Sequence, residues 1–137
     1  MKRVLEVCLI AFALACIMAA QDPAKPMRRP GISVKMPVAS HAVEIPEADN
    51  LDAAVVSVKA DGKIFLGLDP VDVTALRKLN AGDVYVKADA RAPYQTVLTV
   101  LDALQGHPVA LLTAPTTNAP KHTIMPPYGV KLTVGRR

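Results

Sequence analysis

Residues 53–67, "AAVVSVKADGKIFLG", determine how the fold of this chain begins. The first half is rich in β-branched residues that alternate with small or polar ones, and the second half is a short apolar run. Between them lies Asp61-Gly62. An Asp-Gly pair flanked by two strand-like runs is a strong hairpin signal, because glycine readily adopts the positive φ of a tight turn. We therefore predict two antiparallel strands joined by a two-residue turn.

Helical and strand patterns alternate after this hairpin. Residues 69–80, "DPVDVTALRKLN", place apolar side chains near helical spacing. Asp69 suits the cap of this helix and Pro70 its first turn. Three further elements follow: a strand over 83–89, an amphipathic helix over 93–106 that Pro93 opens and Gly106 ends, and a short buried strand over 107–113.

The element order is strand–strand–helix–strand–helix–strand. A helix between each of the last three strands favours an α+β domain with a mixed sheet and both helices on one face. We place this domain at residues 51–114. Aromatic residues make up only 4% of the chain and there is no Trp, so Val, Ala and Leu must fill the core.

Proline-rich stretches flank the domain on both sides. Residues 21–50 carry five prolines, which disfavour a helix and favour an extended tether. Within the tether, "ISVKMPV" at residues 32–38 alternates and could form an edge strand; its apolar positions are Ile32, Val34, Met36 and Val38. Residues 115–137 form a tail. Its final "YGVKLTVGRR" is either a last strand or a loose end that pairs with another subunit.

The N-terminal segment, residues 1–20, has two interpretations. Val4 to Ala20 is apolar except for Glu6, and as a helix it would span about 25 Å, slightly less than a hydrocarbon core of about 30 Å. The basic start and the small residues at the end also fit a cleaved signal peptide. If the helix is retained, Glu6 is a proton-carrying candidate, because a carboxylate in a membrane needs a protein partner or a water path. Otherwise Glu6 lies among the headgroups and has no function.

Charge and motifs exclude several classes of protein. The net charge is +4, and residues 1–31 contribute +3 of it through five Lys and Arg against two acids. The folded part therefore lacks the basic, aromatic-lined patch of a nucleic-acid binder. No hydrolase, metalloprotease, phosphate-loop or paired-cysteine motif is present, so we expect no enzyme activity, no cofactor and no metal. The acids Asp61, Asp69, Asp83 and Asp89 fall at turns or caps.

Two blocks of the sequence resemble the ExbD/TolR family of biopolymer transport proteins. They are "VSVKADGKIFLGLDPV" at residues 56–71 and "VYVKADARAPYQTVLTVLDALQG" at residues 84–106. Both strands end in a Lys-Ala-Asp turn, and the second leads into a Tyr…Asp helix. The family-motif positions in these blocks, which we expect to be structural, are Asp61, Asp89, Tyr94 and Asp102. The resemblance covers about residues 32–114 and extends more weakly to the opening segment, where Glu6 aligns with the family's membrane aspartate.

The resemblance implies a single-pass subunit of the cell inner membrane with its C-terminal domain in the periplasm. It implies an ExbB/TolQ-like membrane partner, self-association as a dimer, and contact with a TonB/TolA-like protein or with peptidoglycan. In such a complex, proton flow at Glu6 would drive motion of the outer domain. The alternative is a secreted periplasmic binding module of the same fold, from which residues 1–20 have been removed.

Overall fold

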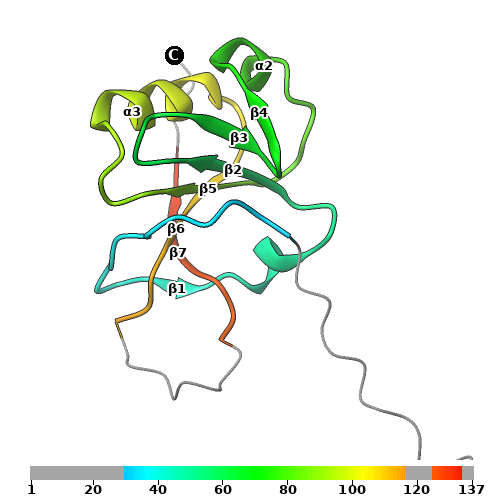
Figure 1. The fold of residues 1–137 in the computed structure, drawn as a ribbon. Helices are drawn as coiled ribbons and strands as arrows, with labels where there is room; N and C mark the ends of the chain where they lie inside the picture. Colours follow the sequence, from blue (N-terminus) through cyan, green and yellow to red (C-terminus); the bar gives the residue numbers. More distant parts are fainter. Residues whose placement is uncertain (1–29, 117–124, 134–137) are drawn as a thin grey trace, which may run out of the picture.

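The computed structural model describes residues 30–116 and 125–133 of the 137-residue chain (Figure 1). The predicted membrane helix over residues 1–20 and its Glu6 lie outside the described residues. Among the helices that are described, none has the length and apolar character needed to cross a bilayer. The described residues form one sheet, two α-helices and a short 3-10 turn, η1 (Pro46–Asp49).

A seven-stranded mixed sheet forms the centre of the domain. The mixed sheet is as predicted, but the predicted element order contains only four of its strands. The strand order of the sheet is β1-β7-β6-β5-β2-β3-β4. The strands are β1 (Val43–Glu44), β2 (Ala54–Val58), β3 (Ile64–Leu66), β4 (Asp69–Val71), β5 (Val84–Ala88), β6 (Val109–Thr113) and β7 (Tyr128–Leu132). The central strands β2, β5 and β6 are parallel, and the outer strands pair antiparallel.

Both helices cover the same face of the sheet. They are α2 (Val73–Arg77) and α3 (Tyr94–Ala103). α3 follows the predicted pattern of apolar spacing, whereas α2 has only five residues and is shorter than the helix predicted over 69–80. Leu76, Val100 and Leu104 are fully buried against Val56, Val86 and other aliphatic side chains of the sheet. Aliphatic residues therefore make up this core, in agreement with the low aromatic content.

The start of the first helix differs from the prediction. Asp72, not Asp69, is the N-cap, and its Oδ1 accepts a hydrogen bond from the Ala75 amide at 2.8 Å. Asp69 and Pro70 belong instead to β4, which pairs with β3 at the edge of the sheet. Proline is tolerated in such an edge strand because its missing N–H can face solvent. Local capping preference could not reveal this long-range pairing.

The β2–β3 hairpin forms, but its connection is longer than the two residues predicted. Lys59 and Lys63 close it, with the Lys59 amide donating to the Lys63 carbonyl at 2.9 Å. Gly62 within the loop has a φ of +81°, the left-handed conformation that favours glycine. The Asp61 side chain accepts a hydrogen bond from the Lys63 amide at 3.1 Å, which holds the loop.

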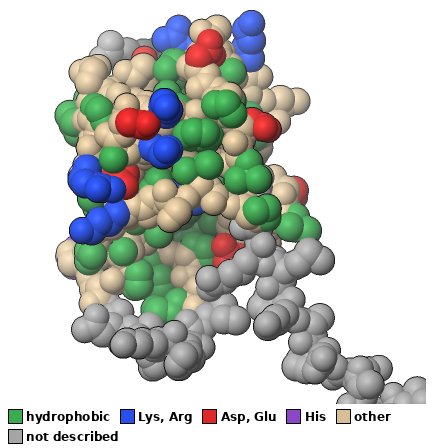
Figure 2. All heavy atoms as spheres, viewed as in Figure 1, with side chains coloured by type: hydrophobic (Ala, Val, Ile, Leu, Met, Phe, Trp, Pro, Cys, Tyr) green, Lys and Arg blue, Asp and Glu red, His purple; other side chains and the backbone are tan. Residues whose placement is uncertain are grey.

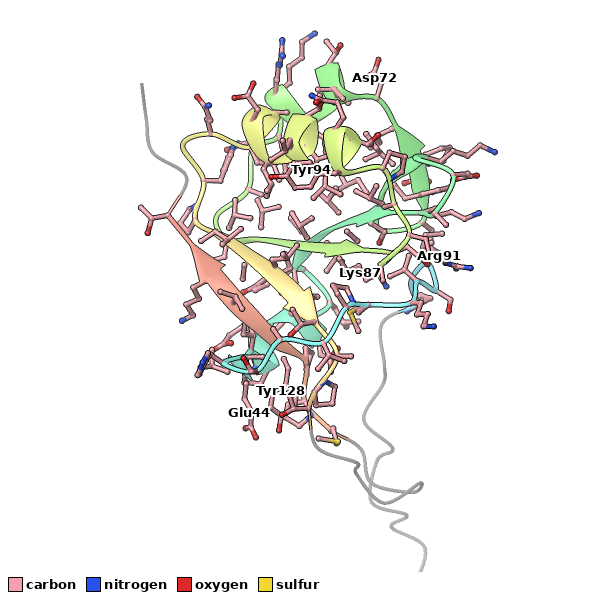
Figure 3. All side chains as sticks on the ribbon, turned by 90° about the vertical axis from the view of Figure 1, so that its left-hand side faces the viewer. Glu44, Asp72, Lys87, Arg91, Tyr94 and Tyr128 are labelled. Atoms are coloured by element: carbon pink, nitrogen blue, oxygen red, sulfur yellow. The ribbon has the colours of Figure 1, made fainter. Side chains whose placement is uncertain are left out.

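The second face of the sheet carries no α-helix. Extended chain from residues 30–53 and the η1 turn cover it, as Figure 3 shows below the sheet. A smaller apolar cluster lies there, and it includes Ile45, Tyr85 and Leu112 with Met36 packed against it. We refer to this as the helix-free face.

The C-terminal strand pairs within the same chain. β7 lies antiparallel to β6 over five residue pairs, and β1 adds to its other side. The Tyr128 hydroxyl donates a hydrogen bond to Glu44 Oε1 at 3.0 Å, which joins β1 to β7 (Figure 3). Of the two interpretations of the tail, the structure therefore shows a last strand in the same sheet.

Candidate functional site

Asp89 fastens the extended segment to the domain. It follows β5 directly and is only 6% exposed. Its carboxylate accepts four hydrogen bonds: from the Lys35 amide at 3.0 Å, the Arg91 amide at 3.0 Å, Arg91 Nε at 2.9 Å and Arg91 Nη2 at 3.1 Å. A residue 54 positions earlier in the chain is thus held by the same carboxylate as the local turn.

These contacts keep Asp89 ionised. The hydrogen bonds from the Arg91 side chain hold the pKa of the Asp89 carboxyl well below its ordinary value, and the Lys35 and Arg91 amides add to the effect. Burial acts in the opposite direction but is weaker. The charged form accepts all four hydrogen bonds at once, whereas a protonated carboxyl would have to give up part of them.

Two backbone bonds extend this attachment. The Ala90 amide donates to the Lys35 carbonyl at 2.7 Å, and the Ala114 amide donates to the Pro37 carbonyl at 2.8 Å. Val38 also forms an isolated parallel bridge with Ala114. The segment therefore runs past the carboxyl ends of β5 and β6, fastened at three points, and we call residues 30–38 the crossing segment.

The predicted edge-strand positions lie in this crossing segment. Ile32, Val34 and Met36 are half-buried and alternate with exposed residues, while Val38 is 64% exposed. Apart from the single bridge at Val38, the crossing segment forms no strand ladder. In the single chain, its alternation thus packs one side of an extended segment onto the helix-free face.

The other family-motif residues occupy separate places. Asp61 lies in the hairpin loop, and the neighbouring Gly62 approaches Pro93 and Thr96 at the start of α3. Tyr94 is 76% exposed on the first turn of α3. Asp102 accepts a hydrogen bond from Gln105 Nε2 at 2.6 Å near the end of that helix. Of these positions, only Asp89 is joined to the crossing segment by a hydrogen bond among the described residues.

Sequence reasoning missed Arg91, Lys87 and Ser57. Lys87 and Ser57 are register partners on β5 and β2, and their side chains lie on the helix-free face. Lys87 is half-buried, and burial lowers the pKa of its ammonium. The Ser57 hydroxyl is fully buried and finds no hydrogen-bond partner in the described part of the chain. A signal was present, because both residues interrupt strands that are otherwise apolar.

The helix-free face is hollowed below the crossing segment. One hollow of about 390 Å³ is lined by Met36, Lys87, Leu112, Met125, Pro127 and Tyr128 among others. Figure 2 shows hydrophobic side chains gathered around a recess in the lower half of the described surface. Within residues 30–116 and 125–133, no group of three or more His, Cys, Asp and Glu side chains is arranged to hold a metal ion.

The arrangement defines a class of protein: a small α+β domain that holds an extended segment against one face of its sheet. The sequence matches the family "Biopolymer transport protein ExbD/TolR" over residues 4–116. The chain therefore belongs to the ExbD/TolR family, as its motifs predicted. This family is one of transport proteins, which is consistent with the interpretation of the chain as a non-enzyme.

Individual relatives agree with this assignment. The biopolymer transport protein ExbD of Escherichia coli (strain K12) is 30% identical over 109 residues, which cover 74% of this chain and 69% of that protein. The ExbD proteins of Escherichia coli O157:H7 and of Shigella flexneri match to the same extent.

Proposed function

We propose that this chain is the membrane-anchored subunit of a proton-driven, energy-transducing complex for transport or envelope maintenance. The observation that carries the proposal is the extent of the family match, which begins at residue 4 and so includes Glu6 and the apolar run around it. In this proposal residues 1–20 stay in the inner membrane as a single helix, and the described domain lies in the periplasm.

Glu6 is the proposed proton carrier. A carboxyl group in a membrane helix is costly when charged, so it would face the helices of an ExbB/TolQ-like partner and alternate between its charged and neutral forms. The crossing segment is the proposed mechanical link, because residues 35 and 37 are bonded to the ends of β5 and β6. Movement of the membrane helix would then reach the sheet through these bonds.

Self-association and outer partners are part of the same proposal. Released from its own sheet, the crossing segment would offer Ile32, Val34, Met36 and Val38 as a strand to a second copy or to a TonB/TolA-like protein. Peptidoglycan is the other proposed contact of the outer domain. Crosslinking from single cysteines placed at Val34 or Val38 would show whether the segment meets a second copy.

The proton role is tested by substituting Glu6 in the complex with its ExbB/TolQ-like partner, reconstituted in liposomes. We expect Glu6→Gln to abolish proton flux, because the amide cannot titrate, and Glu6→Asp to retain a measurable flux. Equal recovery of the partner with each variant controls for assembly. Full proton flux through the Glu6→Gln complex would refute the proposal.

The anchoring role is tested separately by the intact mass of the chain extracted from washed membranes. A mass that includes residues 1–20 supports the anchored subunit. A mature chain that begins near Gln21 and is released with the periplasmic fraction would establish the secreted binding module instead.

A further inference from the structure

A second hollow lies on the helix-free face, away from the crossing segment. It has a volume of about 210 Å³ and opens between η1 and the strands β5, β6 and β7. Its walls are mixed: Ile45, Pro108, Val109, Ala110 and Leu132 form the apolar part, and Glu47, Asp83, Tyr85 and Lys131 form the polar part. A neighbouring hollow of about 390 Å³ shares Glu47, Asp83 and Tyr85 with it and extends to Asp52.

Tyr85 lines both hollows and is only 6% exposed. Within the described ranges, its hydroxyl makes no hydrogen bond with any residue, and it is not among the fully buried hydroxyls without a partner, which are those of Ser57 and Thr113. The hydroxyl therefore reaches the space of the hollows, where water or a polar group that enters can complete its hydrogen bonds. The hydroxyl therefore marks a place where a polar group of a ligand would be accommodated.

The charges around Tyr85 select the kind of ligand. Glu47, Asp52 and Asp83 make no ion pair within the described residues, and all three act on Tyr85. Burial is the main reason that the pKa of Tyr85 is raised, and the three carboxylates raise it further. The basic residue that lines the hollow, Lys131, is exposed and makes no ion pair in the described structure.

We propose that this hollow binds a lysine or arginine side chain presented by a partner protein. The aliphatic stem would lie against Ile45, Pro108 and Ala110. The cationic head would lie between Glu47 and Asp83 and would donate a hydrogen bond to the Tyr85 hydroxyl. An anionic side chain would meet three unpaired carboxylates, and an apolar one would leave the hydroxyl without a partner. The proposal does not depend on proton transfer at Glu6.

The test uses the full chain in a non-ionic detergent and two acetylated, amidated pentapeptides, Ala-Ala-Lys-Ala-Ala and its norleucine counterpart. Norleucine keeps the aliphatic stem and removes the charge. In two-dimensional NMR titrations we expect saturable shifts of the Tyr85, Ala110 and Lys131 amide signals with the lysine peptide only. Equal shifts with the norleucine peptide would overturn the proposal, because the charge would then be irrelevant.

Matched variants locate the binding. We expect Glu47→Gln and Asp83→Asn each to weaken binding of the lysine peptide at least fivefold, and Lys131→Ala to strengthen it about twofold, because the repulsive charge is removed. Asp69→Asn is the control, since Asp69 is an exposed acid on β4 at the opposite edge of the sheet. A loss with Asp69→Asn as large as that with Asp83→Asn would show that only net charge matters.

Two further variants test the role of the Tyr85 hydroxyl and whether the chain's own arginines occupy the hollow. Tyr85→Phe should lower the affinity for the lysine peptide, while the NMR spectrum of the free variant should remain that of a folded protein. Unchanged affinity would contradict the role of the hydroxyl. Arg136 and Arg137 follow β7 in the sequence. If the peptide binds only after both are replaced by Ala, the occupant is this chain's own tail and the proposal of a partner side chain is wrong.

Discussion

The two faces of the sheet differ in what covers them and in what they bury. The helix-covered face holds eleven buried residues, all of them aliphatic, from the strands and the two helices. The helix-free face holds a smaller apolar cluster together with Ser57, Tyr85 and Lys87, and extended chain covers it. Apolar packing stabilises the first face. The second face contains polar groups and hollows, which a partner could contact. Aliphatic burial therefore contributes more to stability on the first face, and the proposed partner contacts lie on the second.

The largest loss of stability is expected for a substitution in the core of the helix-covered face. Leu104→Ala should lower the free energy of unfolding by about 3 kcal/mol, because it leaves a cavity in a fully buried site. Leu98→Ala is the matched control in the same helical region, where Leu98 is 39% exposed, and should cost about 1 kcal/mol or less. Urea unfolding of the full chain measures both. Equal losses would show that α3 does not contribute to the core as described.

A glycine tests the packing of the helix-free face. A Cβ at Gly129 would lie 2.6 Å from the Leu111 carbonyl oxygen and 2.8 Å from Ile45 Cδ1. Gly129→Ala should therefore cost about 2 kcal/mol, because backbone must shift to relieve the clash. Gly82→Ala is the control, since a Cβ there meets nothing within 4 Å. A Gly129→Ala chain as stable as Gly82→Ala would contradict this close packing of β6, β7 and Ile45.

The attachment at Asp89 should make the stability of the crossing segment on the helix-free face depend on pH, unlike that of α3 on the other face. The folded-state pKa of Asp89 is depressed below its ordinary value of 3.8, so its contribution is complete above about pH 5 and is lost as the pH falls through 3.8 and below. In Asp89→Asn this contribution should be absent at every pH. We expect hydrogen exchange of the Ala90 and Ala114 amides to quicken at least tenfold at pH 6, whereas exchange in α3 changes little.

The control for this experiment is Asp61→Asn. Its carboxylate also accepts a backbone hydrogen bond, but only within its own loop. Exchange at Ala114 should not change in Asp61→Asn. If Asp89→Asn leaves Ala114 protected as well, the backbone bonds hold the crossing segment without the carboxylate.

The smallest effect compares neighbouring residues on opposite faces. Ser57→Ala removes a buried hydroxyl that has no partner among the described residues and should change the free energy of unfolding by about 1 kcal/mol or less. Val56→Ala, one residue earlier and fully buried on the helix-covered face, should cost about 2 kcal/mol. Thermal unfolding of both variants checks the order. A large loss with Ser57→Ala would mean that its hydroxyl has a partner, such as bound water.

Elements defined by local patterns could be predicted from the sequence. Alternation identified β2 and β5, a short apolar run identified β6, and helical spacing with Pro93 and Gly106 identified α3. Residues 69–71 were assigned wrongly, because an Asp-Pro pair suits a helix start and three residues are too few to show a strand pattern. The two-residue β1 was missed for the same reason.

The sites depend on contacts that no local pattern records. Asp89 was identified as a motif position, but its partner Lys35 lies 54 residues away. The hollow beside Tyr85 combines η1, β5, β6 and β7, whose residues are widely spaced in the chain. A hydroxyl without a partner is a property of the folded surroundings, so the sequence could indicate Tyr85 only as a strand residue.

The course of the crossing segment has a mechanical consequence. A pull applied at Pro30 would load the bonds at Lys35, Pro37 and Val38 one after another, so they would peel apart in sequence at low force. The ladders between β2, β5 and β6 would not carry that load. Nine freed residues extend to about 30 Å, because each residue of extended chain spans about 3.3 Å. The same attachment would thus set the distance between the domain and the chain before Pro30: short while the bonds hold, and up to about 30 Å longer once they break.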